Sequence, residues 1–210
     1  MWFIAPPGFF ALPLAATPEE RDALASEFVR ELYSRGDESI WEPAAPYYSA
    51  IAEYMAEQGL AYSAMGLFAT EEGVAQCAFT VAALETGQSD PDIAAQGTLA
   101  ILKKDPHNDA RWLDLPCGPA VTCVTLREVT LSPEVAASGK ETKLMTGQIQ
   151  VHIPFPTGPY TAVFTLDTAS VDYWGEFCDM TAAILRTVSF ELPEEAAQSE
   201  FSAESPALRS

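Results

Sequence analysis

The sequence predicts an α+β fold, a mainly antiparallel β-sheet of about six strands with helices packed on it. The apolar pattern changes from a helical to an alternating period near Leu60. The strand-like runs also follow one another without regular strand–helix–strand alternation, which is typical of antiparallel sheets. With 210 residues, of which 48% are hydrophobic, the chain can bury a sizeable core without disulfides or metals.

Two helices are expected ahead of the sheet. Thr17, followed by Pro18, offers an N-cap and a first turn to a helix that ends near Gly36. A second helix is expected to begin after Pro46 and to stop at Gly59. Their apolar stripes, expected to face the core, comprise Leu24, Phe28, Val29, Leu32, Tyr47, Ile51, Tyr54 and Met55.

A hairpin and a third helix are expected next. Alternating runs on both sides of residues 71–73 indicate two antiparallel strands, and pairing Ala69 with Val74 gives both one apolar face. The same register sets Tyr62 opposite Val81, Ala64 opposite Phe79 and Gly66 opposite Cys77. The third helix opens at Asp90 and closes at Pro106. Its inner side is expected to carry Ile93, Gly97, Ala100 and Ile101.

Further strands and a closing helix complete the fold. The strand-like segments are Trp112–Leu115, Val121–Leu131, a segment ending at Ile153, and Tyr160–Leu166. The closing helix follows Asp172, and its apolar stripe comprises Trp174, Phe177, Cys178, Thr181, Ile184, Leu185 and Val188. We interpret residues 1–192 as a single α+β domain and residues 193–210 as a disordered acidic tail, because the tail has little to bury.

The turn Pro154–Pro159 is the leading candidate for an interaction site. Three prolines restrict its backbone, so little conformational entropy would be lost on binding. Pairing Ile153 with Tyr160 creates a polar face beside the turn. The candidate interaction residues are Phe155 at the tip and His152, Gln150, Gln148 and Thr161 on that face. In the alternative interpretation, the prolines only end the strands and Phe155 folds back onto the core.

The charge balance restricts the partners. Lys and Arg number 11 against 30 Asp and Glu, and the net charge of −19 disfavours binding to nucleic acids and anionic membranes. No apolar run is long enough to span a membrane, and the apolar start lacks the basic region of a signal peptide. Cys77, Cys117, Cys123 and Cys178 have no paired spacing and are expected to be reduced. We therefore expect a cytoplasmic protein.

Part of the chain resembles a known architecture. A long strand after a Pro-Gly break, the hairpin QIQVHIPFPTGPYTAVFTLDT and the closing helix resemble, in element order, the Mog1/PsbP-type α/β/α sandwich over residues 60–190. The segments WLDLPCGPA and HIPFPTGPY are also similar to those of acidic, Ala-rich actinobacterial proteins, a likeness that implies no activity. The Mog1/PsbP resemblance implies a non-catalytic module that docks on a larger protein, and it transfers no specific binding residues.

Catalytic patterns are sparse. The sequence has no G-x-G-x-x-G after a strand, no phosphate-binding loop and no G-x-S-x-G elbow. His107 and His152 lack partners at metal-ligand spacing, so no metal or cofactor is predicted. The enzymatic alternative is a thiol nucleophile at Cys117, with His152 as base and Asp167 or Asp114 orienting it. In the structural alternative, Cys117 only fills a small space beside a turn.

A non-catalytic protein-interaction module, an adaptor or regulator that docks on a larger assembly, is the leading hypothesis. Its partner would be a protein. The alternatives are a small-molecule-binding protein that uses a crevice between sheet and helix, and an enzyme of unrecognised type. The aromatic residues around Tyr47 bear on this choice, because they are interpreted first as core and otherwise as a pocket or an interface. They are Trp41, Tyr47, Tyr48 and Tyr54.

Overall fold

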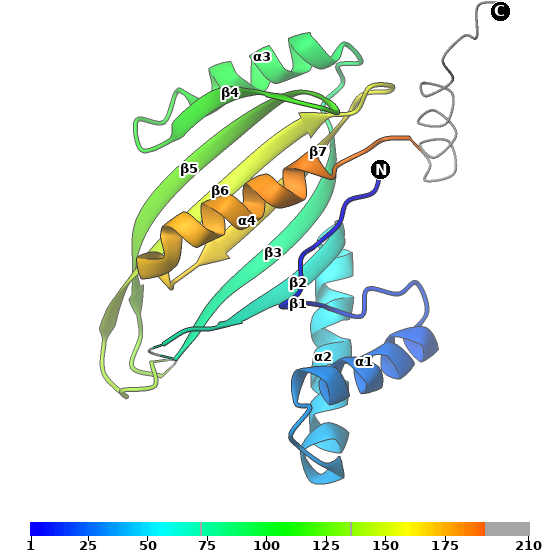
Figure 1. Ribbon diagram of the computed structural model, residues 1–210, viewed down its shortest axis with the longest axis vertical. Coiled ribbons are helices and arrows are strands. Elements are labelled where there is room, and N and C mark those ends of the chain that lie inside the picture. The colour runs from blue at the N-terminus through cyan, green and yellow to red at the C-terminus, as the bar shows by residue number, and fades with distance from the viewer. Residues whose placement is uncertain (72, 135, 192–210) are drawn as a thin grey trace, which may run out of the picture.

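One antiparallel sheet of seven strands forms the centre of the computed structural model, which describes residues 1–71, 73–134 and 136–191. The strands are β1 (Phe9–Ala11), β2 (Leu60–Ala69), β3 (Val74–Glu85), β4 (Asp109–Leu115), β5 (Gly118–Leu131), β6 (Thr142–Pro154) and β7 (Tyr160–Thr168). They pair in the order β1-β2-β3-β7-β6-β5-β4 (Figure 1). The predicted α+β class is confirmed. The strand beyond the expected six is β1, which pairs with β2. The predicted tail, residues 193–210, lies outside the described residues.

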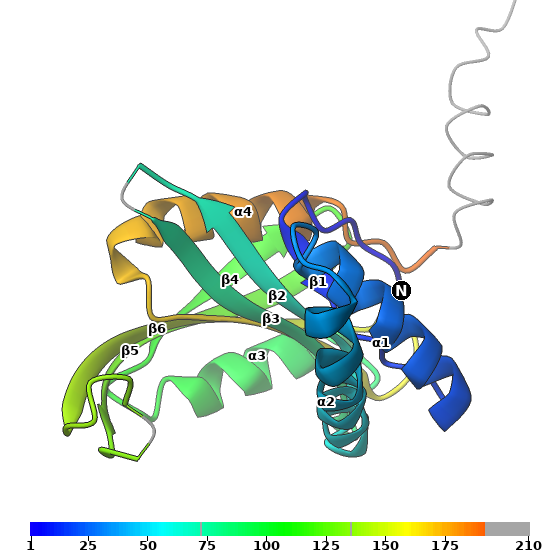
Figure 2. The ribbon, with the colours of Figure 1, turned by 90° about the horizontal axis from the view of Figure 1, so that it is seen from below.

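Helices cover both faces and one edge of the sheet. They are α1 (Pro18–Leu32), α2 (Glu38–Glu57), α3 (Pro91–Leu102) and α4 (Trp174–Arg186), with a 3-10 turn, η1 (Val171–Tyr173), ahead of α4. Helix α4 lies across one face, and α3 covers β4, β5 and β6 on the opposite face (Figures 1 and 2). Helices α1 and α2 pack on each other and meet the sheet at β1 and β2.

The main core lies between the sheet and α4. Phe79 of β3, Val151 of β6 and Phe164 of β7 alternate onto this face and meet Phe177 of α4. Because successive side chains of a strand point to opposite faces, this core takes every second residue of the central strands. The predicted stripe of α4 provides the other half, and its buried members are Phe177, Thr181, Ile184, Leu185 and Val188.

The N-terminal residues join the same core beside α4. Trp2 forms an isolated β-bridge with Ser189. The ring of Phe3 packs edge-on against the ring of Phe164, with 5.4 Å between centroids. The start of the chain therefore packs against the segment that follows α4.

Two helix starts and one hairpin agree with the sequence. The side chain of Thr17 accepts a hydrogen bond from the Glu20 N–H at 3.3 Å and caps α1. Asp90 caps α3 by accepting from the Ile93 N–H at 3.0 Å. The predicted β2–β3 register is confirmed, from Ala69 opposite Val74 to Tyr62 opposite Val81.

The β6–β7 register differs from the prediction by two residues. Ile153 pairs with Ala162, not with Tyr160, and the strands remain paired as far as Pro154 and Thr161. The loop is closed by the N–H of Phe155, which donates to the carbonyl of Tyr160 at 2.8 Å. A slip of two residues keeps every side chain on its own face, so the hydrophobic pattern could not detect it.

Helix α2 begins nine residues earlier than expected. Its N-cap is Asp37, whose side chain accepts from the Ser39 N–H at 3.0 Å. The helix then continues through Pro43 and Pro46, so the predicted start after Pro46 is wrong. Both prolines are exposed, which lets water satisfy the two carbonyls that lose their helical donors.

The buried faces of three helices differ in part from the prediction, although Phe28 and Val29 of α1 are buried as expected. Leu24 of α1 and Tyr47 and Tyr54 of α2 are exposed, as are Ile93 and Ile101 of α3. The residues that are buried instead include Arg21, Ala25, Ala52, Ala94 and Ala95. Small side chains let each helix approach its neighbour closely. In α3 the remaining faces are also apolar, so periodicity alone could not choose the inner one.

Candidate functional site

The tip of the β6–β7 hairpin is close-packed at Phe155. The half-buried Phe155 ring lies 4.8 Å from the Phe190 ring and 6.4 Å from the Tyr160 ring, measured between centroids. The exposed loop residues are Pro156 and Thr157. Phe155 therefore packs back onto the body of the molecule, and the loop backbone is what the hairpin presents outward.

The predicted polar face lies on the α3 side of the sheet. Gln148 donates from Nε2 to Asp167 Oδ1 at 2.8 Å. His152 Nε2 and Thr161 Oγ1 are buried and have no hydrogen-bond partner among the residues that the structure describes. Burial lowers the pKa of His152, because it disfavours the charged ring. A binding partner could reach neither buried atom unless the chain rearranged, whereas Gln148 and Gln150 are partly accessible.

The proposed thiol nucleophile and its base lie on opposite faces of the sheet. Cys117 packs against the core on the α4 side. His152 alternates with the core residues Val151 and Ile153 and so points to the α3 side. Burial also raises the pKa of the Cys117 thiol, which disfavours a reactive thiolate. The arrangement does not assemble a Cys–His pair.

A projecting pair of helices, α1 and α2 with the connecting residues 33–37, forms the most distinctive surface, and we call it the helical arm (Figures 1 and 2). The Phe28 and Tyr48 rings pack at 4.8 Å between centroids, and the Tyr33 and Tyr48 hydroxyls are 2.9 Å apart. The buried Arg21 donates from Nη2 to Glu53 Oε1 at 2.7 Å. These contacts hold the two helices together.

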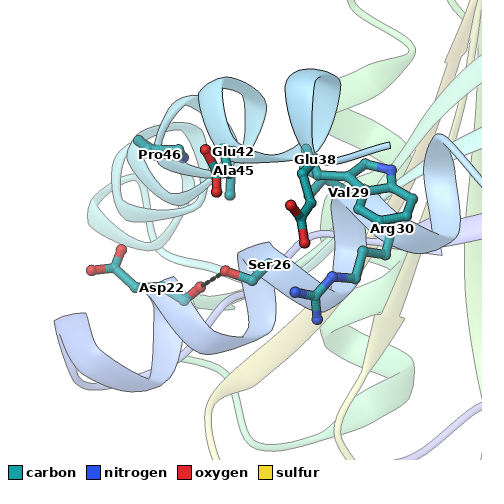
Figure 3. A pocket seen from close by; sticks show the side chains of 9 residues that line it. Asp22, Ser26, Val29, Arg30, Glu38, Glu42, Ala45 and Pro46 are labelled. Atoms are coloured by element: carbon teal, nitrogen blue, oxygen red, sulfur yellow. Dashed lines mark hydrogen bonds between the residues drawn. The ribbon is translucent and has the colours of Figure 1, made fainter. Parts of the chain in front are cut away.

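A hollow of about 400 Å³ lies between the helices of the arm. Its lining residues are Asp22, Ser26, Val29, Arg30, Glu38, Trp41, Glu42, Ala45 and Pro46. Figure 3 shows the carboxylates of Glu38 and Glu42 between the helices and the guanidinium of Arg30 at one side, whereas the carboxylate of Asp22 points away from Arg30. The Asp22 carboxylate accepts a hydrogen bond from Ser49 Oγ at 2.6 Å. The Arg30 guanidinium lies 5.9 Å from the centroid of the Trp41 ring. Because Arg30 of the chain itself lies over the Trp41 ring, the acidity of the hollow comes from its carboxylates, which suit a further positively charged group.

An exposed apolar stripe runs along α2 beside this hollow. Ile40, Tyr47 and Tyr54 follow one another at seven-residue intervals, and the tyrosines are 66% and 59% exposed. Pro43 and Ala50 lie between them on the same face and are also exposed. At 1.5 Å per residue the stripe is about 21 Å long. The opposite face of α2, with Trp41 and Tyr48, packs on α1, so the aromatic group divides between core and surface.

A second hollow, of about 380 Å³, lies between the β2–β3 hairpin and the start of α4. It is mostly apolar, and we call it the crevice. Its lining residues are Phe68, Ala69, Thr70, Glu71, Ala75, Tyr173, Glu176, Phe177 and Met180. The Phe68 and Phe177 rings lie 6.1 Å apart between centroids. Among the described residues, Glu71 and Glu176 are the charged members of its lining.

Comparison with known proteins gives no relative from which a function for these surfaces could be inferred, so they are interpreted from their chemistry. No protein family, curated protein or solved structure matches the chain. Within the described residues, no group of three or more His, Cys, Asp or Glu side chains is placed to hold a metal ion. None of the helices described is both long and apolar enough to cross a membrane.

The sequence contained a signal for the arm. The repeat Ile40, Tyr47 and Tyr54 is visible in the sequence, but a helix begun after Pro46 excludes Ile40 and Pro43 from it. For the crevice, the sequence predicts only that a binding site between sheet and helix is one alternative, and it does not identify the residues of that site. Its walls come from segments about one hundred residues apart, which no local pattern connects.

Proposed function

We propose that this chain is a non-catalytic protein-interaction module that docks on a larger assembly through its helical arm. The exposed α2 stripe carries the proposal. Tyrosine is enriched in protein interfaces, where a rigid side chain supplies a large contact area at a small entropic cost. Tyr47 and Tyr54 stand on a helix already held by α1, so docking would order little of the chain.

The chemistry of the arm suggests the partner. Beside the stripe, the hollow presents the carboxylates of Glu38 and Glu42, whereas that of Asp22 already accepts from Ser49 Oγ. A complementary partner is a protein with an apolar groove or helix for the stripe and a Lys or Arg side chain for the hollow. The net charge of −19 would steer such a basic surface toward the chain and would repel nucleic acids. A cytoplasmic location fits this proposal, because the four free thiols would stay reduced there.

Site-specific photocrosslinking tests the arm. p-Benzoyl-phenylalanine at Tyr47 and, separately, at Tyr54 should give one adduct of the same mass in cells that normally contain the protein. The same probe at Tyr160, which is also exposed but belongs to β7 and not to the arm, serves as the control. The double variant Glu38→Lys/Glu42→Lys should abolish the adduct while circular dichroism shows an unchanged fold. No adduct at either tyrosine, or the same adduct at Tyr160, would refute docking through the arm.

Binding of a small molecule in the crevice is the second candidate, favoured by the apolar walls of Phe68 and Phe177. The two carboxylates of the lining suit an apolar ligand with a cationic group. Octyltrimethylammonium should then raise the melting temperature and octyl sulfate should not. Ala69→Phe, which fills the mouth of the crevice, should remove the effect, and Ala61→Phe on the same strand should not. Equal effects of both probes would contradict this function.

A further inference from the structure

Helix α3 presents an apolar face to solvent. Ala95 faces the sheet and is fully buried, whereas Ile93 and Ile101 on the other side are 54% and 65% exposed. Asp92 is the one charged residue of the helix. The exposed Gln96 borders this face, but its centre along Ile93, Gly97 and Ile101 is apolar, and an exposed apolar face usually marks a contact. The described residues of the chain cover only one side of α3, which points to a missing contact on the other.

Gly97, at the middle of this exposed face, is the second observation. Glycine is a poor residue for a helix interior, and a site that needs it usually has a close neighbour. Apart from the helix's own backbone, no heavy atom of the described residues lies within 4 Å of a Cβ added at Gly97, and its φ angle is not positive. The fold of the single chain therefore gives no reason for glycine there. A second backbone packed against α3 would give one.

The pattern around Gly97 is symmetric. Ile93 and Ile101 stand four residues before and after it, and Asp90 and Lys104 stand seven before and after. We propose that a second copy of this chain packs on α3, with the two helices antiparallel and a two-fold axis at Gly97. Each Ile93 then faces the second copy's Ile101.

The charges favour this antiparallel arrangement. Asp90 and Asp92 lie at the start of the helix, and Lys103 and Lys104 follow its end. Antiparallel packing brings opposite charges together at both ends, whereas parallel packing would bring like charges together. The two lysines are also among only 11 basic residues in a chain with a net charge of −19.

The proposed contact between the two α3 helices is small, so the affinity of the dimer is low. A helix of 12 residues is about 18 Å long, so one helix from each copy buries less than the roughly 1,200–2,000 Å² of a standard interface. Two chains of strong negative charge also repel each other. The dimer is therefore weak and reversible, and screening of this repulsion by salt strengthens it. This surface is separate from the helical arm and does not depend on the function proposed for it.

Sedimentation equilibrium at protein concentrations from about 10 μM to about 1 mM tests the proposal, because weak dimers form in this range. The weight-average mass should rise toward that of two chains, more so at 0.3 M than at 0.03 M NaCl. Ile101→Asp should weaken association about tenfold or more, as loss of a central contact does. Ile4→Asp, at an isoleucine of similar exposure elsewhere, should not.

The Gly97→Ala variant distinguishes specific packing of the two α3 helices from nonspecific hydrophobic association. Alanine favours the helix and meets open space in the single chain, so the melting temperature should rise by about 2 °C. The added methyl groups should nevertheless push the paired helices apart and weaken the dimer. A Gly97→Ala variant that associates as well as the original chain would overturn the proposal. A chain that remains monomeric at the highest concentration would do the same.

Discussion

The contact between Gly147 and Trp174 provides a direct test of how the sheet positions α4. Gly147 is a buried residue of β6, and Trp174 is the first residue of α4. A Cβ added at Gly147 would lie 2.8 Å from Trp174 Cε3, and still closer to Cζ3. Carbon atoms in contact are normally about 3.5–4 Å apart, so the ring would have to move. Gly147→Ala should therefore displace the start of α4.

The cost follows from this overlap. Forcing a methyl group into a packed core typically costs about 1–3 kcal/mol, and a rigid indole ring can yield little, so we expect about 2 kcal/mol. For a chain of this size that corresponds to a melting temperature lower by about 4–8 °C. Urea unfolding followed by circular dichroism should show the loss as a lower midpoint with an unchanged slope.

Two variants make the reasoning specific. Gly175→Ala adds a methyl group at the residue after Trp174, where nothing lies within 4 Å, and should leave stability unchanged or slightly higher. In a Trp174→Leu background, Gly147→Ala should cost much less, because the ring it strikes is gone. If Gly147→Ala unfolds at the same urea concentration as the original chain, or costs as much without the indole, the steric argument is wrong.

Two further expectations concern pH. Burial lowers the pKa of His152, so below about pH 6.5 the unfolded chain binds a proton that the folded chain does not. The free energy of unfolding should therefore decrease as the pH is lowered below about 6.5, and this decrease should be smaller in His152→Gln when measured by urea unfolding. If the decrease is the same in both proteins, His152 is not its cause. Burial raises the pKa of Cys77 to about 12, so only the unfolded thiol ionises above about pH 8.5. The free energy of unfolding should therefore decrease as the pH rises above about 8.5, and it should decrease less in Cys77→Ala. An equal decrease in both proteins would contradict this.

The two hairpins show what the sequence could and could not predict. The turn between Ala69 and Val74 is short, and alternation on both strands is enough to set the β2–β3 register. Between Pro154 and Tyr160 the loop is longer, and registers two residues apart place the same side chains on the same face. The β6–β7 register is recognisable only from the closing bond between Phe155 and Tyr160. The local sequence pattern therefore predicts which face of the sheet each side chain occupies, whereas the loop sets the register of the two strands.

The helices were harder to predict than the sheet, for two physical reasons. The prediction begins α2 after Pro46, because proline is common at a helix start, but the Asp37 cap begins the helix ahead of Pro46. In α3 the apolar residues surround the helix, so the inner face depends on which side fits the sheet. The small Ala94 and Ala95 fit it, and the isoleucines remain outside. The candidate binding surfaces lie on α2 and α3, the two helices whose start or inner face was hard to predict. Both helices expose apolar residues that have no place in the core, and a binding surface requires such residues.

The two proposed surfaces would act together without overlapping. The arm meets the sheet at β1 and β2, whereas α3 covers β4, β5 and β6 at the other end of the strand order. A dimer formed through α3 would therefore leave the stripe of each arm accessible. Two arms on one particle would bind a repetitive partner more tightly than one, because the second contact forms at the high effective concentration set by the first. The weak α3 contact would also be strengthened once both arms are bound. Gly97→Ala should then weaken binding to a repetitive partner but not to a single partner molecule, although Gly97 touches neither.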